Sequence, residues 1–176
     1  MKKAKKAVTL ALCVVICLAI AVFAAGCKSE KAGGHDVDIA YFTEIGTMPE
    51  SEFKIGDGVP EIAEDSEEYF VGEADGRGYF SNGEFFYYYD KSEEQPVITA
   101  IAAFGTAFGF ETGAVSIEVT KALDSQEVEY TLRAPEKGEV FFLPASDNRE
   151  VAVCDTPEHK ITFVFEDNAL CAVYMA

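Results

Sequence analysis

Few residues of this chain are of the types that perform nucleophilic catalysis, and their spacing does not assemble a catalytic group. The sequence contains two histidines, His35 and His159, and five cysteines. A Ser or Cys nucleophile needs a base and an orienting group held in fixed geometry. His35 lies in a polar, glycine-rich stretch and His159 beside an expected turn. We therefore interpret both as ordinary polar residues, and we expect no catalytic residue and no enzymatic activity.

Metal and phosphate chemistry also lack their usual sequence patterns. Cys154 and Cys171 have no CxxC spacing and no paired histidines, so a tetrahedral zinc site lacks ligands. The glycines at 76–78 and 105–109 lack the strand-to-helix context and the lysine of a phosphate-binding loop. We expect no metal and no cofactor.

Carboxylates are too abundant for any one of them to indicate a site. The sequence has 31 acidic residues, several of them adjacent, and we interpret most as solvated charge. Two alternatives stay open. One is a cell-envelope hydrolase that uses two carboxylates. The other is a domain stabilised by calcium, for which the candidate ligands are Asp36 with Asp38, or Asp57 with Glu61.

Residues 1–26 predict an export signal that ends at Cys27. A cationic start is followed by residues 7–25, which carry no charge, and then by the small residue Gly26. The segment resembles the lipobox of bacterial lipoproteins, although Ala24 stands where Leu is usual. The resemblance implies that the chain is cut before Cys27 and that a lipid is attached to its sulfur. An uncleaved transmembrane helix is the alternative, because 19 residues approach the roughly 20 that cross a bilayer.

The rest of the chain is expected to lie outside the membrane as one tethered, acidic domain. Residues 27–38 predict a flexible tether, and residues 39–176 predict a single domain. Without the signal, 10 basic residues face 31 acidic ones, a formal charge of −21. Nucleic acid is excluded as a partner, because its binding requires neutralisation of phosphates. The expected partners are the membrane, through the lipid anchor, and a protein or cell-wall component.

Turn signals between apolar runs predict two similar halves, at about 53–104 and 108–176. Asn82-Gly83 lies between strands expected at 78–81 and 84–90, and Asp167-Asn168 lies between strands expected at 161–166 and 169–174. Further strands are expected at 97–104 and 150–155, and helices at 60–70 and at 116–123 with Ser116 as its cap. The predicted fold class is α+β, an antiparallel sheet from two tandem helix-plus-three-strand repeats with the helices on one face.

The C-terminal hairpin predicts one core face and two separate thiols. With a two-residue loop, the core-facing side of this hairpin contains Ile161, Phe163, Phe165, Leu170, Ala172 and Tyr174. Cys154 and Cys171 then lie on strands separated by the central one, about 10 Å apart. A disulfide requires Cα atoms within about 7 Å, so we predict two free, buried thiols.

Short segments across both halves resemble those of bacterial lipoproteins with tandem helix–strand repeats. These segments are residues 53–57, 68–70, 111–113 and 161–168. The architecture of those proteins is similar to beta-lactamase inhibitor protein and to small outer-membrane-assembly lipoproteins. The sequence departs from the repeat at Asp124, where a glycine is expected. The resemblance implies a membrane-tethered binding scaffold and carries over no catalytic residue.

An aromatic run indicates where a partner would bind. Residues 85–89 are all Phe or Tyr, and a two-residue loop would pair Phe80 with Phe85 and Tyr79 with Phe86. Phe80, Phe85, Tyr87 and Tyr89 are assigned to the core. Tyr79, Phe86 and Tyr88 fall on the other face, and we predict that they form a binding surface, because interfaces favour such side chains. The alternative is that both faces are buried, or that this face closes against the second half.

Overall fold

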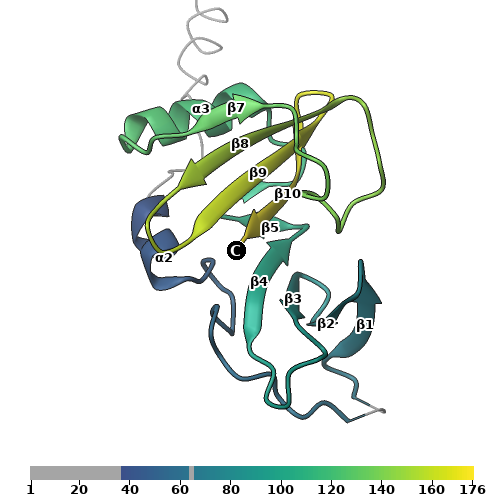
Figure 1. Cartoon of the computed structure of the whole chain (residues 1–176). Coiled ribbons are helices and arrows are strands. Elements are labelled where there is room, and N and C mark those ends of the chain that lie inside the picture. The colour runs from purple at the N-terminus through teal and green to yellow at the C-terminus, as the bar shows by residue number, and fades with distance from the viewer. Residues whose placement is uncertain (1–36, 64–65) are drawn as a thin grey trace, which may run out of the picture. The chain divides into compact units, whose positions relative to one another are not determined.

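The computed structural model describes residues 37–63 and 66–176 and has an α+β fold (Figure 1). The predicted signal, Cys27 and all of the predicted tether except positions 37 and 38 lie outside the described residues. The helices in the described part of the chain are α2 (Ile39–Ile45) and α3 (Ser116–Ser125). The strands are β1 (Phe70–Ala74), β2 (Arg77–Ser81), β3 (Phe85–Tyr89), β4 (Ile98–Ala103), β5 (Thr106–Ala107), β6 (Phe110–Glu111), β7 (Thr131–Arg133), β8 (Arg149–Asp155), β9 (Lys160–Glu166) and β10 (Ala169–Met175).

Eight strands form one antiparallel sheet made of two four-stranded meanders. The strand order is β1-β2-β3-β4-β10-β9-β8-β7, and β5 and β6 form a separate hairpin. The meanders meet where β4 pairs with β10 over three residue pairs, from Val173 opposite Ala103 to Met175 opposite Ile101. Each meander therefore has four strands, one more than the three that the sequence predicted.

The helix expected at 60–70 is not found in the described residues. Residues 60–63 and 66–69 are not helical, and Phe70 begins β1. The Ser66 hydroxyl accepts hydrogen bonds from the backbone N–H groups of Glu68 (3.3 Å) and Tyr69 (3.1 Å), which stabilises a turn in place of a helix. The chain then pairs with β2, and this tertiary pairing overrides the local helix preference.

Two short capping signals explain the helices that form. Sequence reasoning missed α2, which begins after Asp38, whose side chain accepts from the Tyr41 N–H (2.9 Å), and ends at Gly46 with φ 71°. The prediction of α3 is confirmed, but its cap is Val115, not Ser116. The Ser116 N–H donates instead to the Asn168 carbonyl (2.9 Å). The turn of the C-terminal hairpin therefore supplies an acceptor for a first-turn N–H group that has no partner within the helix.

One cluster of buried residues combines side chains of both helices with side chains of the sheet, and we call it the helix-side core. Ile39 of α2 and Leu123 of α3 belong to this cluster. The β5–β6 hairpin adds Phe108 and Phe110, whose rings lie 5.9 Å and 6.1 Å from that of Phe163. The sheet contributes Phe80, Phe85, Tyr87, Ile98, Ile101, Ala103, Ala152, Cys154, Ile161, Phe163, Phe165, Leu170, Val173 and Met175.

A bulge in β10 changes which of its side chains face the helix-side core. Glu166 pairs with Ala169 and Phe165 with Leu170 as predicted, but the register shifts between Leu170 and Ala172. One extra residue turns every later side chain to the opposite face. Ala172 and Tyr174, predicted in this core, therefore lie on the other side of the sheet, and Val173 and Met175 take their places.

The Asn82-Gly83 hairpin forms with a register that differs by two residues from the prediction. Phe80 lies opposite Tyr87 and Tyr79 opposite Tyr88, because the loop has four residues, not two. The Asn82 side chain accepts from the backbone N–H groups of Glu84 (3.1 Å) and Phe85 (2.9 Å), which stabilises this wider loop. A shift of two keeps each side chain on its face, so the assignment of these aromatics to two faces is confirmed.

Cys154 and Cys171 are both free thiols on strands that β9 separates, as predicted. Cys154 is buried in the helix-side core, and burial raises the pKa of its thiol to about 12. Cys171 lies at the bulge and is only half-buried, in contrast to the prediction; its thiol donates to the Val164 carbonyl at 3.3 Å.

Replacing Ile161 with alanine should destabilise the fold strongly. Its side chain is fully buried in the helix-side core, so Ile161→Ala removes apolar contacts and leaves a cavity. We expect the free energy of unfolding to fall by about 2–5 kcal/mol, as measured by urea denaturation. The matched control is Ile117→Ala, at a side chain that is 54% exposed, and a similar loss in that variant would contradict this view of the core.

Candidate functional site

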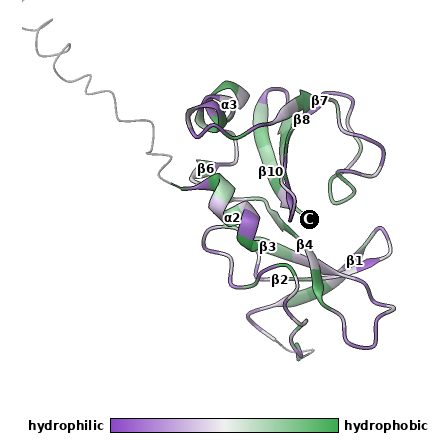
Figure 2. Ribbon diagram, turned by 60° about the vertical axis from the view of Figure 1, so that its left-hand side comes forward, coloured by the Kyte–Doolittle hydropathy of each residue, from purple (hydrophilic) through white to green (hydrophobic). Residues whose placement is uncertain are grey.

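The sheet face opposite the helix-side core, here called the second face, is covered only in part. The cover is the connection between β7 and β8, residues 134–148, which we call the strap. Val140, Phe142 and Leu143 of the strap pack against the buried valines of β8 and β9. Figure 2 shows this connection on the side of β8 and β10 opposite α3. Strands β8, β9 and β10 thus have buried residues on both faces.

Ion pairs fasten the strap at both of its ends. Glu139 has a side chain that is only 7% exposed, and its two oxygens accept from the Arg133 guanidinium at 2.7 Å each. These hydrogen bonds, opposed in part by burial, hold the pKa of the Glu139 carboxyl below its usual value. At the other end the buried Arg149 donates to the Pro144 carbonyl and pairs with Glu166 at 3.1 Å. The two parallel hydrogen bonds between Arg133 and Glu139 fix the relative orientation of these side chains.

An aromatic cluster runs along the second face and under the strap. Its members are Phe70, Tyr79, Phe86, Tyr88, Phe104, Phe141, Phe142 and Tyr174, joined by ring contacts. Tyr88 is only 2% exposed, because Phe141 packs edge-on against it with ring centres 5.1 Å apart. The prediction that Tyr88 offers its side chain to a partner is therefore wrong, since the second half closes over it.

The cluster reaches the surface at one end, which we call the aromatic surface and define as Phe70, Tyr79 and Phe86. Phe70 is 48% exposed, and its ring centre lies 5.7 Å from that of Phe86 and 6.3 Å from that of Tyr79. Tyr79 and Phe86 are half-buried. The ring of Tyr79 lies over Gly72 of β1, where a side chain would collide with it. Two of the three predicted residues thus come together at an accessible surface.

Phe70 is the member of this surface that sequence reasoning missed. It was placed in the expected helix at 60–70, whereas it lies on β1 at the edge of the sheet. The signal that could have found it is Asp75-Gly76, a two-residue hairpin loop with φ of 50° and 77°. Asp-Gly between apolar runs is a strong hairpin pattern, and it would have predicted a strand ending at Ala74.

Three of the other residues considered for chemistry, His159, Asp38 and Asp57, have structural partners, and His35 and Asp36 lie outside the described residues. The His159 ring packs against Gly46, the left-handed cap of α2. Asp38 caps α2, and the Asp57 side chain accepts from the Lys54 N–H at 3.0 Å. Across residues 37–63 and 66–176, no group of three possible His, Cys, Asp or Glu ligands is placed to hold a metal ion.

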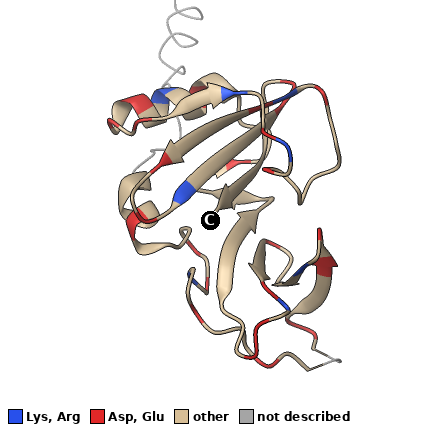
Figure 3. Cartoon of the chain, in the orientation of Figure 1, with Lys and Arg blue, Asp and Glu red and all other residues tan. Residues whose placement is uncertain are grey.

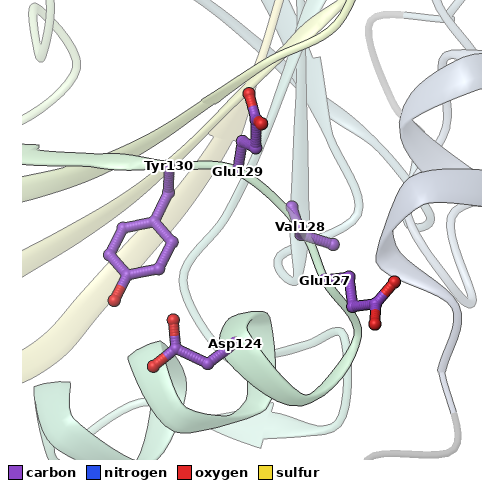
Figure 4. A pocket seen from close by; sticks show the side chains of 5 residues that line it. All are labelled: Asp124, Glu127, Val128, Glu129 and Tyr130. Carbon is purple, nitrogen blue, oxygen red and sulfur yellow. The ribbon is translucent and has the colours of Figure 1, made fainter.

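An acidic pocket of about 650 Å³ lies after the end of α3 (Figure 4). Its lining includes Asp124, Glu127, Glu129 and Tyr130. Burial and the adjacent Asp124, which accepts the phenol's hydrogen bond, raise the pKa of Tyr130. Figure 4 shows the three carboxylates pointing in different directions, with only Asp124 turned toward Tyr130. The arrangement does not direct two carboxylates at one point, which glycoside hydrolysis requires.

Comparisons with protein-family models, curated proteins and solved structures found no match to this chain. In the part of the chain that the structure describes, no helix has the length and apolar character required to span a membrane.

Replacing Glu139 with glutamine should loosen the strap in a pH-dependent way. The folded-state pKa of Glu139 is lowered, so its charge stabilises the fold above the usual Glu pKa of about 4.3 and ceases to do so as the pH falls through the lower folded-state value. At neutral pH, Glu139→Gln should reduce the free energy of unfolding by about 1–3 kcal/mol. Denaturant titrations between neutral and acidic pH should show this difference shrinking below about pH 4.

Glu136→Gln is the control, because Glu136 lies on the same segment with a side chain that is 76% exposed and 3.6 Å from Arg133. Its effect should be small at every pH. A Glu139 effect that does not change with pH would contradict a role for its ionised form.

Proposed function

We propose that this protein is a lipoprotein anchored through Cys27 on the extracytoplasmic face of the cell membrane, where it acts as a non-catalytic binding module. Support for the anchor comes from the leader: a cationic start, the uncharged residues 7–25 and small residues before Cys27. The lipid supplies the contact with the membrane, and residues 28–38, rich in Gly, Ser and charge, supply the reach of the domain.

The observation that carries the binding role is the aromatic surface. Phe70, Tyr79 and Phe86 form a connected apolar group on a strongly acidic chain, and Phe70 exposes nearly half of its side chain. Aromatic side chains bury large areas with few rotatable bonds, so they serve as interface anchors. Because the surrounding chain is acidic, the partner is a protein or cell-wall component that is not itself strongly anionic.

We propose further that the two halves are tandem repeats with both helices on one face of the sheet. Each four-stranded meander follows one short helix, α2 before β1 and α3 before β7. Buried residues of both helices belong to the helix-side core. These features support the likeness to the beta-lactamase inhibitor protein-like fold, which implies a membrane-tethered binding scaffold.

Replacing Cys27 with serine should remove the lipid anchor. Serine has no thiol for alkylation, so the variant should lose the mass of the acyl groups and leave the membrane fraction. Intact-mass spectrometry of the protein from its own cells, combined with membrane fractionation, measures both. Cys171→Ser is the control and should keep the lipid. Unmodified, cytosolic wild-type protein would contradict the proposal.

The aromatic surface can be tested by photo-crosslinking in intact cells. A photoreactive residue at position 70 should yield adducts with an envelope component, and Phe86→Ser in the same chain should reduce them about tenfold or more, because a buried aromatic anchor contributes about 2 kcal/mol. The control places the photoreactive residue at Leu132, which is 47% exposed on β7 at the other edge of the sheet. Equal yields from the two positions would refute this surface as the contact.

A further inference from the structure

A small pocket with basic side chains lies at the junction of the two meanders. Its volume is about 330 Å³. Its walls come from β2, the strap, the start of β9 and the end of β10. The lining residues are Arg77, Glu136, Lys137, Gly138, Glu139, Phe141, Lys160, Tyr174 and Ala176.

The charge of this pocket is opposite to that of the chain. The whole sequence has 14 basic and 31 acidic residues, and Figure 3 shows the acidic residues distributed over most of the described elements. Three cations nevertheless line this one pocket, and a fourth, Arg133, neutralises the lining acid Glu139 through two hydrogen bonds of 2.7 Å. With Arg133 counted, four cations lie in or beside this pocket, against the two carboxylates of Glu136 and Glu139.

Arg77 is held in position by aromatic rings. Its guanidinium carbon lies 4.6 Å from the centre of the Phe141 ring, and one of its nitrogens donates to the Tyr174 hydroxyl at 3.4 Å. A cation–π contact orients the planar group and leaves its other N–H donors unused. Within the described residues, Arg77 has no carboxylate at ion-pair distance, in contrast to Arg133 and Arg149.

Lys160 and Lys137 add two further cations from different elements. The backbone of Lys160 is fixed by paired hydrogen bonds with Ala176, of 2.8 Å and 3.0 Å, at the edge of the pocket. Its ammonium lies 3.8 Å from Glu139, a loose contact that leaves N–H donors for another acceptor. Lys137 lies on the strap beside Gly138, in the same lining.

We infer that this pocket binds a small ligand through a carboxylate or phosphate group. The guanidinium of Arg77 presents parallel donors that fit two oxygens of such a group, and the two lysines act as point charges beside it. With about 30 Å³ for each water-sized group, the volume admits a ligand of roughly ten heavy atoms. The inference depends neither on the lipid anchor nor on the aromatic surface.

Calorimetric titration of the purified full-length chain in detergent at low salt tests this site. The probes are inorganic phosphate and succinate, which separate a phosphate ligand from a carboxylate ligand. We expect at least one probe to bind, with an affinity that falls as salt is added. Arg77→Gln should weaken binding about 10- to 100-fold, because a charged hydrogen bond contributes that much. Arg77→Lys should have an intermediate affinity, because it keeps the charge and loses the fork.

Two further variants keep the test decisive if Arg77→Gln alters the fold. Lys137→Gln changes a lining cation on the strap and should weaken binding severalfold. Lys91→Gln is the matched control, since Lys91 pairs with Glu73 at 2.6 Å and lies outside the pocket. Absence of binding by both probes, or equal weakening by the Lys91 and Lys137 variants, would overturn the inference.

Discussion

The pairing of β4 with β10 is the interaction on which the rest of this domain depends. Only three residue pairs join the two meanders, against seven between β8 and β9. The junction is possible because β4 carries small residues on its second face, Ala100 and Ala102, which leave space for the rings of Tyr88 and Tyr174. The helix-side core, the aromatic cluster and the basic pocket each contain residues from both meanders.

The strap then determines what the second face can do. It covers the valines of the second meander and the ring of Tyr88, and it stops before Phe70, Tyr79 and Phe86. The strap also supplies five of the pocket's lining residues, Glu136, Lys137, Gly138, Glu139 and Phe141, and Glu139 is held there by its ion pair with Arg133. One segment without regular strands thus separates a buried aromatic region from an exposed one and encloses a site for anions.

The strong negative charge of the chain distinguishes the aromatic surface and the basic pocket from the rest of the protein surface. On a chain with 31 acidic residues, an exposed aromatic group and a pocket rich in cations are both departures from the surrounding surface. Burial of apolar area favours association at the first, and long-range attraction concentrates anions at the second against a repelling background. Two such surfaces are consistent with the binding role that we propose for this domain.

Local sequence patterns by themselves determined the α+β class, helix α3 and most of the strands, because these depend on periodicity and turn residues within a few positions. They also assigned Tyr79, Phe86 and Tyr88 to the face opposite the core, since a register error of two preserves alternation. Only the tertiary structure decided the β10 bulge, which reverses Ala172 and Tyr174, and the burial of Tyr88 under Phe141. The burial of Tyr88 depends on its contact with Phe141, more than 50 positions away, and Arg77 likewise contacts the distant Tyr174. Local patterns do not encode such distant pairings.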